Sequence, residues 1–238
     1  MLRIALIIWL ACVTGCVSAP STATQQAPLL VIAPIDVSVS WPASALDRAI
    51  TTVGGILDSL QGGDRLVVRA ITATSHSGDG ILLDVTMPIV GKVGQFDQAG
   101  RVKALSQAKV ADSIRRAARQ RLSKIRTLRH PRRTDIVGAL YAAAEIAASE
   151  GRRTIIVPFT DGRDDGGNGS AELDLAGLDV RFMAFEGTQL SETTRLKGLW
   201  TKRLEAAGVR SVEFIPAGQP LVLSSFRTSR ASTLASTK

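Results

Sequence analysis

The fold is decided by the segment Leu29–Trp41, which reads LLVIAPIDVSVSW. Its first part, Leu29–Val37, is almost entirely apolar and shows no alternation of polar and apolar positions. A continuous apolar run of this length is typical of a strand that is buried on both faces of a parallel sheet. Polar residues follow from Asp36 to Ser40, and a helical pattern begins at Pro42. We therefore predict a central strand, a polar loop and then a helix.

The rest of the chain alternates between short apolar runs and longer helical patterns, which is typical of an α/β fold. The predicted strands cover 29–37, 65–74, 81–87, 153–159, 178–185 and 209–215, and the predicted helices cover 42–60, 134–149, 191–207 and part of 101–130. The short connection SHSGDG at 75–80 favours an antiparallel hairpin. The sequence thus predicts a mostly parallel six-stranded sheet with helices on both faces and one antiparallel edge strand.

The first residues, Met1–Gly15, have the pattern of a targeting segment. Arg3 precedes the apolar stretch Ile4–Val13, which is shorter than the roughly 20 residues that a membrane-spanning helix needs. The sequence Val13–Cys16, VTGC, resembles the lipobox of bacterial lipoproteins, and it predicts that Cys16 is acylated and becomes the mature N-terminus. Cleavage near 17–19, as in an ordinary secreted protein, is the alternative.

Cysteine usage agrees with lipidation, since Cys12 would leave with the signal peptide and only Cys16 would remain. The predicted organisation is a signal peptide at 1–15, a lipidated cysteine and flexible tether at 16–28, one domain at 29–223 and a disordered tail at 224–238. We expect a cell-envelope location. Val17 after the cysteine, rather than Asp, favours the periplasmic face of the outer membrane over the inner membrane.

Oxygen-bearing side chains follow three distant segments, each beside a predicted strand or helix end. They are Asp36, Ser38, Ser40, Thr134 and Asp161. In open parallel sheets, the carboxyl ends of the strands meet at the point where the strand order reverses. Carboxylate and hydroxyl oxygens suit a hard divalent cation, so the sequence predicts a cation site at this edge.

This set resembles the metal-ion-dependent adhesion site of the von Willebrand factor A-type domain family. The family has the same succession of elements in a Rossmann-like sheet, and the resemblance spans most of 29–215. It implies hydroxyl ligands from Ser38, Ser40 and Thr134, and direct or water-mediated ligands from Asp36 and Asp161. The chain departs from the family at Val39, where Gly is common, and at Trp41, where Met often follows.

Each residue of the set also has an ordinary structural interpretation. Thr134 could cap a helix that begins at Asp135, and the two serines could be polar residues at a strand exit. Asp161 and Gly162 could form a simple turn. The acidic residues that follow, at 164–165, do not have EF-hand spacing and are predicted to form a flexible loop at the rim of the site.

A basic segment interrupts the domain. Between Arg101 and Arg133 there are twelve Lys or Arg residues and one acidic residue, Asp112, and we assign the segment to a helical insertion at about 91–130. An apolar stripe is predicted to dock this helix, and arginines beside it are predicted to face an anionic membrane surface: Arg115, Arg116, Arg119 and Arg126. A solvated helix face is the alternative. Nucleic acid is disfavoured, because no aromatic residue interleaves the basic positions.

The charge of the predicted site suggests its use. Two carboxylates and one divalent cation are close to neutral, so an acidic group of a partner can complete the coordination. We therefore predict a lipid-anchored envelope protein that binds an acidic macromolecular partner, expected to be a protein, through Mg²⁺, with Ca²⁺ or Mn²⁺ as alternatives. No nucleophile with an adjacent base is recognisable. The alternatives are a Mg²⁺-dependent phosphohydrolase or phosphotransferase with Asp36 as nucleophile, although Ser38 stands where the haloacid-dehalogenase pattern has a second Asp, and a metal-free scaffold.

Overall fold

The computed structural model describes residues 27–76, 80–91, 93–94, 96–128, 133–165, 173–183, 185 and 189–227. The predicted signal peptide, the lipidation site Cys16 and the tether up to residue 26 lie outside these residues. So do residues 228–238 of the predicted tail. Within the described ranges, no helix combines the length and the apolar character that crossing a bilayer requires.

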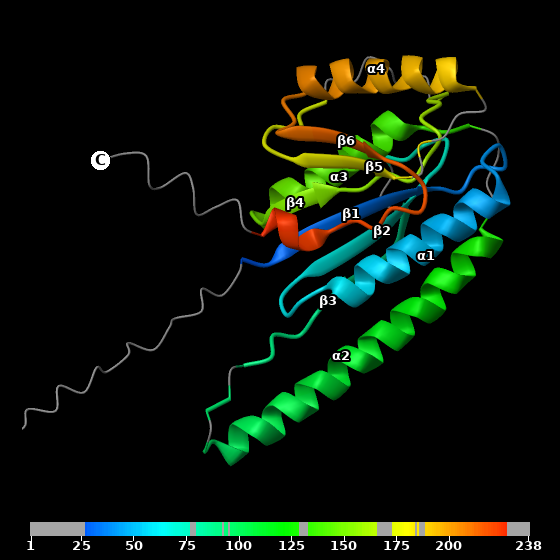
Figure 1. Ribbon diagram of the computed structural model, residues 1–238. Helices are drawn as coiled ribbons and strands as arrows, with labels where there is room; N and C mark the ends of the chain where they lie inside the picture. The colour runs from blue at the N-terminus through cyan, green and yellow to red at the C-terminus, as the bar shows by residue number, and fades with distance from the viewer. Residues whose placement is uncertain are drawn as a thin grey trace, which may run out of the picture.

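In the described part of the chain, six strands form one sheet in the order β3-β2-β1-β4-β5-β6 (Figure 1). Their bounds are β1 Leu29–Asp36, β2 Arg65–Ile71, β3 Ile81–Thr86, β4 Arg153–Ile156, β5 Asp179–Met183 and β6 Ser211–Ile215. Neighbouring strands are parallel except β2 and β3, which pair antiparallel at one edge. The predicted α/β Rossmann-like fold class, with one antiparallel edge strand, is confirmed.

The central strand β1 is buried along its whole length. Val31, Ala33 and Ile35 belong to an apolar cluster on one face of the sheet, while Leu30 and Ile32 belong to a cluster on the other face. Because successive side chains of a strand point to opposite faces, a strand that is covered on both faces has to be apolar at every position. This is the physical reason for the uninterrupted apolar run in the sequence.

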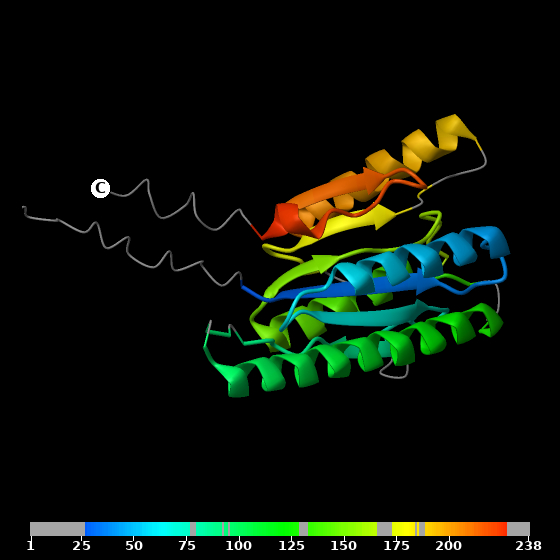
Figure 2. The same ribbon diagram turned by 60° about the horizontal axis from the view of Figure 1, so that its bottom comes forward.

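Helices cover both faces of the sheet. Their bounds are α1 Ala43–Ser59, α2 Gln98–Lys124, α3 Ile136–Glu150 and α4 Leu190–Ala206, and short 3-10 turns follow at η2 Ile125–Thr127 and η3 Leu223–Phe226. Buried residues of α1 and α2 belong to one apolar cluster, and those of α3 and α4 belong to the other. Figures 1 and 2 show α1 and α2 together on one side of the sheet.

The strand order reverses beside β1. The chain passes from β1 to β2 on one side and returns to β4 on the other side, so β1 lies between two parallel neighbours. The loop from β1 to α1, the loop after β4 and the start of α3 therefore gather at the carboxyl edge of the sheet. In folds of this kind, ligands bind at this edge.

The end of the domain differs from the prediction. Residues Ser224–Arg227 are part of the fold, whereas the sequence assigned them to a disordered tail. Leu223 and Phe226 of η3 are buried in the core, and Arg227 forms an ion pair with Asp64 in which both side chains are buried. Phe226 and Arg227 lie in a Ser/Thr/Arg-rich stretch, whose composition indicates a disordered tail, and the acidic partner of Arg227 is distant in the sequence.

Candidate functional site

Asp36 is the last residue of β1, and its side chain is held in place at the carboxyl edge. The residue is 1% exposed. Its backbone N–H donates to the carbonyl of Phe159 at 2.9 Å, which joins β1 to the segment that follows β4. Oδ1 accepts from the backbone N–H of Ser38 at 2.8 Å, and Oδ2 accepts from Thr160 Oγ1 at 3.2 Å. Both carboxylate oxygens are therefore oriented by neighbouring donors.

The two predicted serine ligands lie next to one another. Ser38 Oγ and Ser40 Oγ are 2.8 Å apart. Adjacent oxygens around an octahedral Mg²⁺ with bonds of 2.0–2.1 Å are about 2.9 Å apart, so this spacing suits a shared cation. Ser38 is buried, whereas Ser40 is exposed. At the two positions that depart from the family pattern, the Val39 side chain is exposed and the Trp41 side chain is buried in the core.

Thr134 is buried and does not cap the following helix. The N-cap of α3 is Asp135, whose Oδ1 accepts from the backbone N–H of Gly138 at 2.8 Å. The capping interpretation of Thr134 is therefore wrong. The Thr134 carbonyl accepts from the backbone N–H of Asp165 at 2.8 Å. This bond ties the start of α3 to the loop that carries Asp161.

The loop after β4 positions the second carboxylate. Asp161 Oδ1 accepts from the backbone N–H of Arg163 at 3.0 Å. Gly162 has φ +81°, and its carbonyl accepts from the indole N–H of Trp200 at 2.8 Å. Asp164 Oδ1 accepts from the backbone N–H of Ile136 at 2.9 Å. The segment at 164–165, predicted as a flexible rim loop, is thus hydrogen-bonded to the start of α3.

Burial disfavours the ionised form of both carboxylates. Burial raises the pKa of Asp36, and the nearby charge of Asp161 raises it further, although hydrogen bonds from Ser38 and Thr160 act in the opposite direction. Burial also raises the pKa of Asp161, while Arg163 lowers it. Partly desolvated acidic groups that repel one another are stabilised in their ionised form by a cation between them. The donor set therefore fits a hard divalent cation.

The five predicted ligands come from three segments that the fold brings to one edge of the sheet. Contacts link Asp36 to Ser38 and Ser38 to Ser40 directly, and backbone bonds link the other two segments to the same edge. Among the described residues, no three His, Cys, Asp or Glu side chains form a metal-binding group. The candidate site contains two such side chains, and its remaining oxygens are hydroxyls.

Sequence reasoning missed the supporting residues. Thr160 donates to Asp36, Asp135 caps α3 and also accepts from the backbone N–H of Ser75 at 3.1 Å, and Gly162 sets the turn after Asp161. The glycine had a signal, since an Asp-Gly pair favours a turn. Nothing in the sequence indicates that the Thr160 hydroxyl points at the first carboxylate.

The predicted anion-binding arginines are mostly engaged within the protein. Arg119 pairs with Asp58 at 2.5 Å, Arg126 pairs with Asp47 at 2.8 Å, and Arg115 Nη2 donates to the carbonyl of Leu60 at 3.3 Å. These contacts hold the second half of α2, and η2 after it, against α1 and the residue that follows α1. Arg116, Arg119 and Arg126 are exposed as predicted, and Arg115 is partly buried. Since Arg119 and Arg126 are paired with acidic residues of α1, part of the charge of this face is neutralised within the protein, and its binding to an anionic surface stays a prediction.

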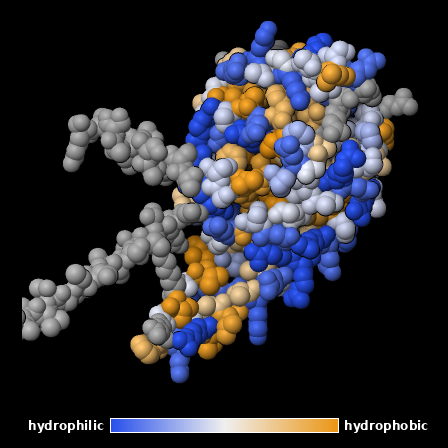
Figure 3. Space-filling model, in the orientation of Figure 1, coloured by the Kyte–Doolittle hydropathy of each residue, from blue (hydrophilic) through white to orange (hydrophobic). Residues whose placement is uncertain are grey.

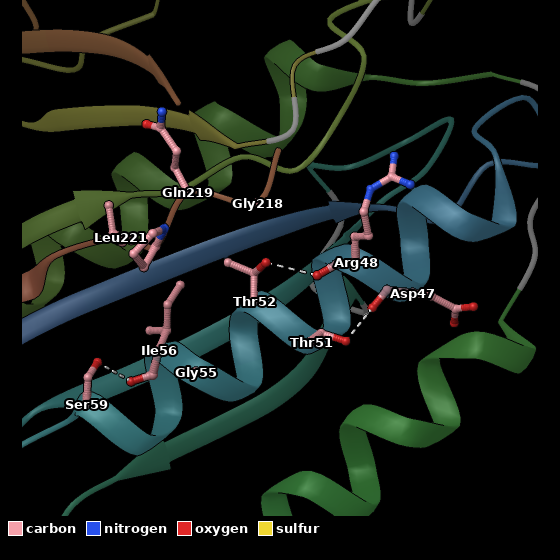
Figure 4. Close-up of a pocket in the computed structure, with 11 residues that line it drawn as sticks. Asp47, Arg48, Thr51, Thr52, Gly55, Ile56, Ser59, Gly218, Gln219 and Leu221 are labelled. Atoms are coloured by element: carbon pink, nitrogen blue, oxygen red, sulfur yellow. Dashed lines mark hydrogen bonds between the residues drawn. The ribbon is translucent and has the colours of Figure 1, made fainter. Parts of the chain in front are cut away.

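A separate groove of about 600 Å³ lies between α1 and the segment Gly218–Leu221 (Figure 4). Its hydroxyl groups are hydrogen-bonded to the helix backbone: Thr51 and Thr52 donate to carbonyls one turn earlier at 2.9 Å, and Ser59 donates to the carbonyl of Ile56 at 2.7 Å. None of the five candidate ligands lines this groove. It offers a largely apolar surface and carries no part of the candidate site.

No protein-family model matches this sequence, and no curated protein matches it either. Among solved structures, the chain is similar to the von Willebrand factor type A protein from Catenulispora acidiphila, with 16% sequence identity and a TM-score of 0.49. The similarity covers 79% of this chain and 39% of that one, so this chain spans about two fifths of that protein's length.

Proposed function

We propose that this protein is a binding protein that uses a divalent cation to hold an acidic group of a macromolecular partner, expected to be a protein. The observation that carries the proposal is the position of Asp36 and Asp161 at the carboxyl edge of the neighbouring strands β1 and β4, where burial raises the pKa of both and the charge of Asp161 raises that of Asp36 further. A hydroxyl pair, Ser38 and Ser40, lies beside the first of them. Arg163 partly offsets the charge of Asp161, and a divalent cation would offset the charge of both carboxylates.

The residues have separate roles in this proposal. Asp36 and Asp161 supply the negative charge, and Ser38, Ser40 and Thr134 supply neutral oxygens. Mg²⁺, or else Mn²⁺ or Ca²⁺, would supply an open coordination position for a carboxylate of the partner. Since the two carboxylates balance the cation, an approaching acidic group meets little repulsion. A site with four carboxylates would repel the same group.

We further propose that the protein is held at a bacterial envelope membrane by acylation of Cys16. The support is the lipobox-like sequence at 13–16 and the lone cysteine that would remain after cleavage. Mass spectrometry of the protein extracted from bacterial membranes tests this proposal. A mature N-terminus at Cys16 carrying acyl chains supports it, and a free N-terminus near residue 19 contradicts it.

Thermal unfolding of the full chain tests the cation site. In excess Mg²⁺, at about 100 times the dissociation constant, binding to the folded state alone stabilises by about 2.7 kcal/mol. The Asp36→Asn variant should lose this response. Because burial already disfavours ionised Asp36, the neutral variant should be at least as stable as the parent protein in chelator. The matched control is Asp112→Asn, on the exposed side of α2.

Partner binding tests the use of the site. Envelope proteins captured by the full chain should be released by chelator and should not be captured by the Asp36→Asn variant. Partners that survive both treatments would contradict cation-dependent binding. Phosphatase turnover measured on the same proteins distinguishes the enzymatic alternative. Turnover that needs both Mg²⁺ and Asp36 would replace the binding proposal with a phosphohydrolase.

A further inference from the structure

The first half of α2 projects away from the domain. The buried residues of this helix are Ala111, Ala118 and Leu122, and all of them lie in its second half. At 1.5 Å per residue, the preceding part, Gln98–Val110, is about 20 Å long. Figure 1 shows this end of α2 extending beyond the sheet and beyond α1. We call Phe96–Val110 the α2 projection.

Large apolar side chains on the α2 projection face solvent. Phe96 is 92% exposed, Val102 is 69% exposed and Leu105 is 65% exposed. Figure 3 shows hydrophobic residues gathered on this projecting end. Ile89 and Val90, in the segment that leads to the helix, are also exposed. Exposed apolar groups of this size, gathered at one end of a molecule, favour contact with an apolar phase.

Basic side chains accompany the apolar ones. Val102, Leu105 and Lys109 are three and four residues apart, and Arg116 follows one heptad later, so the four share one side of the helix. Lys103 adds a further positive charge, and no acidic residue occurs from Gln98 to Ala111. A helix that combines apolar and basic residues in this way is typical of segments that lie in the interface of anionic membranes.

The α2 projection lies at the end of the molecule where the chain enters the fold. β1 begins at Leu29 at this end, and α2 begins at the same end in both views (Figures 1 and 2). Ala27, the first described residue, lies two positions before β1. The candidate cation site lies at the opposite end, at the carboxyl edge of the strands. A surface that contacts the α2 projection would leave the cation site turned away from it.

We propose that the α2 projection docks on an anionic phospholipid surface, with Phe96, Val102 and Leu105 entering the headgroup region and Lys103, Lys109 and Arg116 contacting phosphate groups. Arg115, Arg119 and Arg126 do not take part, because they bind the Leu60 carbonyl, Asp58 and Asp47 on or beside α1. The docking is independent of the cation site. The docking rests on the proposed lipid anchor only in that the anchor would bring the membrane close to this end of the molecule.

A local fluorescent probe tests the docking on the full chain. Both native cysteines are replaced by serine, and an environment-sensitive dye is attached at Leu105→Cys. The matched control carries the dye at Leu199→Cys, an exposed position on α4. The vesicles contain phosphatidylcholine alone or with phosphatidylglycerol. Since the N-terminal segment is the same in every protein, a difference between the two dye positions reports on contact by the helix itself.

We expect a blue shift and quenching by nitroxide-labelled lipid at position 105, on the anionic vesicles only, and no change at position 199. Each basic residue near an anionic surface contributes about fivefold to binding, so the triple variant Lys103→Gln, Lys109→Gln, Arg116→Gln should lower the docking equilibrium on the order of 100-fold. The control triple variant on α4, Arg195→Gln, Lys197→Gln, Lys202→Gln, should leave it unchanged.

Three outcomes would overturn the docking proposal. The dye at position 105 stays in water on both kinds of vesicle, or it responds equally to neutral and anionic vesicles, or the triple variant on α2 behaves like the control triple variant. If the emission of the dye at position 105 does not change with vesicles but shifts when soluble envelope proteins are added, the α2 projection binds a protein partner instead. The Mg²⁺ response of the same variants should be intact in every case, which separates this proposal from the cation site.

Discussion

Gly162 follows the second candidate carboxylate, and its replacement by Ala should destabilise the fold through a defined clash. The residue has φ +81°, and an added Cβ would lie 2.1 Å from Cε2 of Phe185. The Phe185 ring is held by Phe182 and Phe214, whose ring centroids are 5.3 Å and 5.0 Å away. The ring therefore cannot move aside without disturbing this aromatic cluster.

Two contributions set the expected size. A left-handed conformation costs a non-glycine residue roughly 1–2 kcal/mol, and forcing extra volume into a packed core costs roughly 1–3 kcal/mol. Gly162→Ala should therefore lower the free energy of unfolding by about 2–5 kcal/mol. For a domain of about 200 residues, each kcal/mol lowers Tm by roughly 2–4 °C, so Tm should fall by roughly 4–20 °C.

Gly151→Ala is the matched control. Gly151 ends α3 with φ +60°, and an added Cβ there has no heavy atom within 4 Å. It should show the conformational cost alone, about 1–2 kcal/mol. Urea unfolding of both variants, and of Gly162→Ala combined with Phe185→Leu, measures the difference. Equal losses at the two glycines, or strictly additive effects of the Gly162 and Phe185 substitutions, would refute the clash.

Two further predictions concern ion pairs. Arg227→Met leaves the buried carboxylate of Asp64 without its ion pair and should lower the free energy of unfolding by about 3–5 kcal/mol in urea. The control Arg126→Met breaks a half-exposed pair with Asp47 and should lower it by less than about 1 kcal/mol. Similar losses in the two variants would show that the Arg227–Asp64 pair does not stabilise the fold. Burial raises the pKa of Asp179, but hydrogen bonds and neighbouring arginines outweigh burial and lower the pKa overall. Its contribution to stability is thus present above the unfolded-state pKa and lost as pH falls through the folded-state value, so Asp179→Asn should be less stable at pH 7 and should lose less stability on acidification. Parallel stability curves from pH 7 to pH 3 would contradict this assignment.

Local sequence patterns were sufficient for most of the fold. The apolar run of β1, the hairpin of β2 and β3, and the docked stripe of α2 were all recognisable, because burial on a strand or helix imposes a period on the residues. The stripe residues Ala118, Leu122 and Ile125 are indeed buried. The helix after Thr134 was predicted to begin two residues too early, because Thr134 and Asp135 are both of residue types that commonly cap a helix, and the sequence does not tell which of them does so.

The candidate site was predictable as a set of residue types and not as a set of contacts. Asp36 ends β1 and Asp161 lies in the loop after β4, and the reversal of strand order places both at one edge. The Thr160 hydroxyl bond to Asp36 and the Asp135 cap of α3 depend on which way side chains point after packing. Periodicity holds no information about that direction.

The sequence by itself determined the alternation of strands and helices, the burial of β1 on both faces and the types of residue that follow the strands. These features depend on neighbours within a few positions along the chain. The tertiary structure alone decided that Arg119 and Arg126 bind the acidic residues of α1, that the first half of α2 projects, and that Arg227 enters the core beside Asp64. Charges pair with whatever opposite charge the packing brings within a few ångströms, and those partners come from distant parts of the chain.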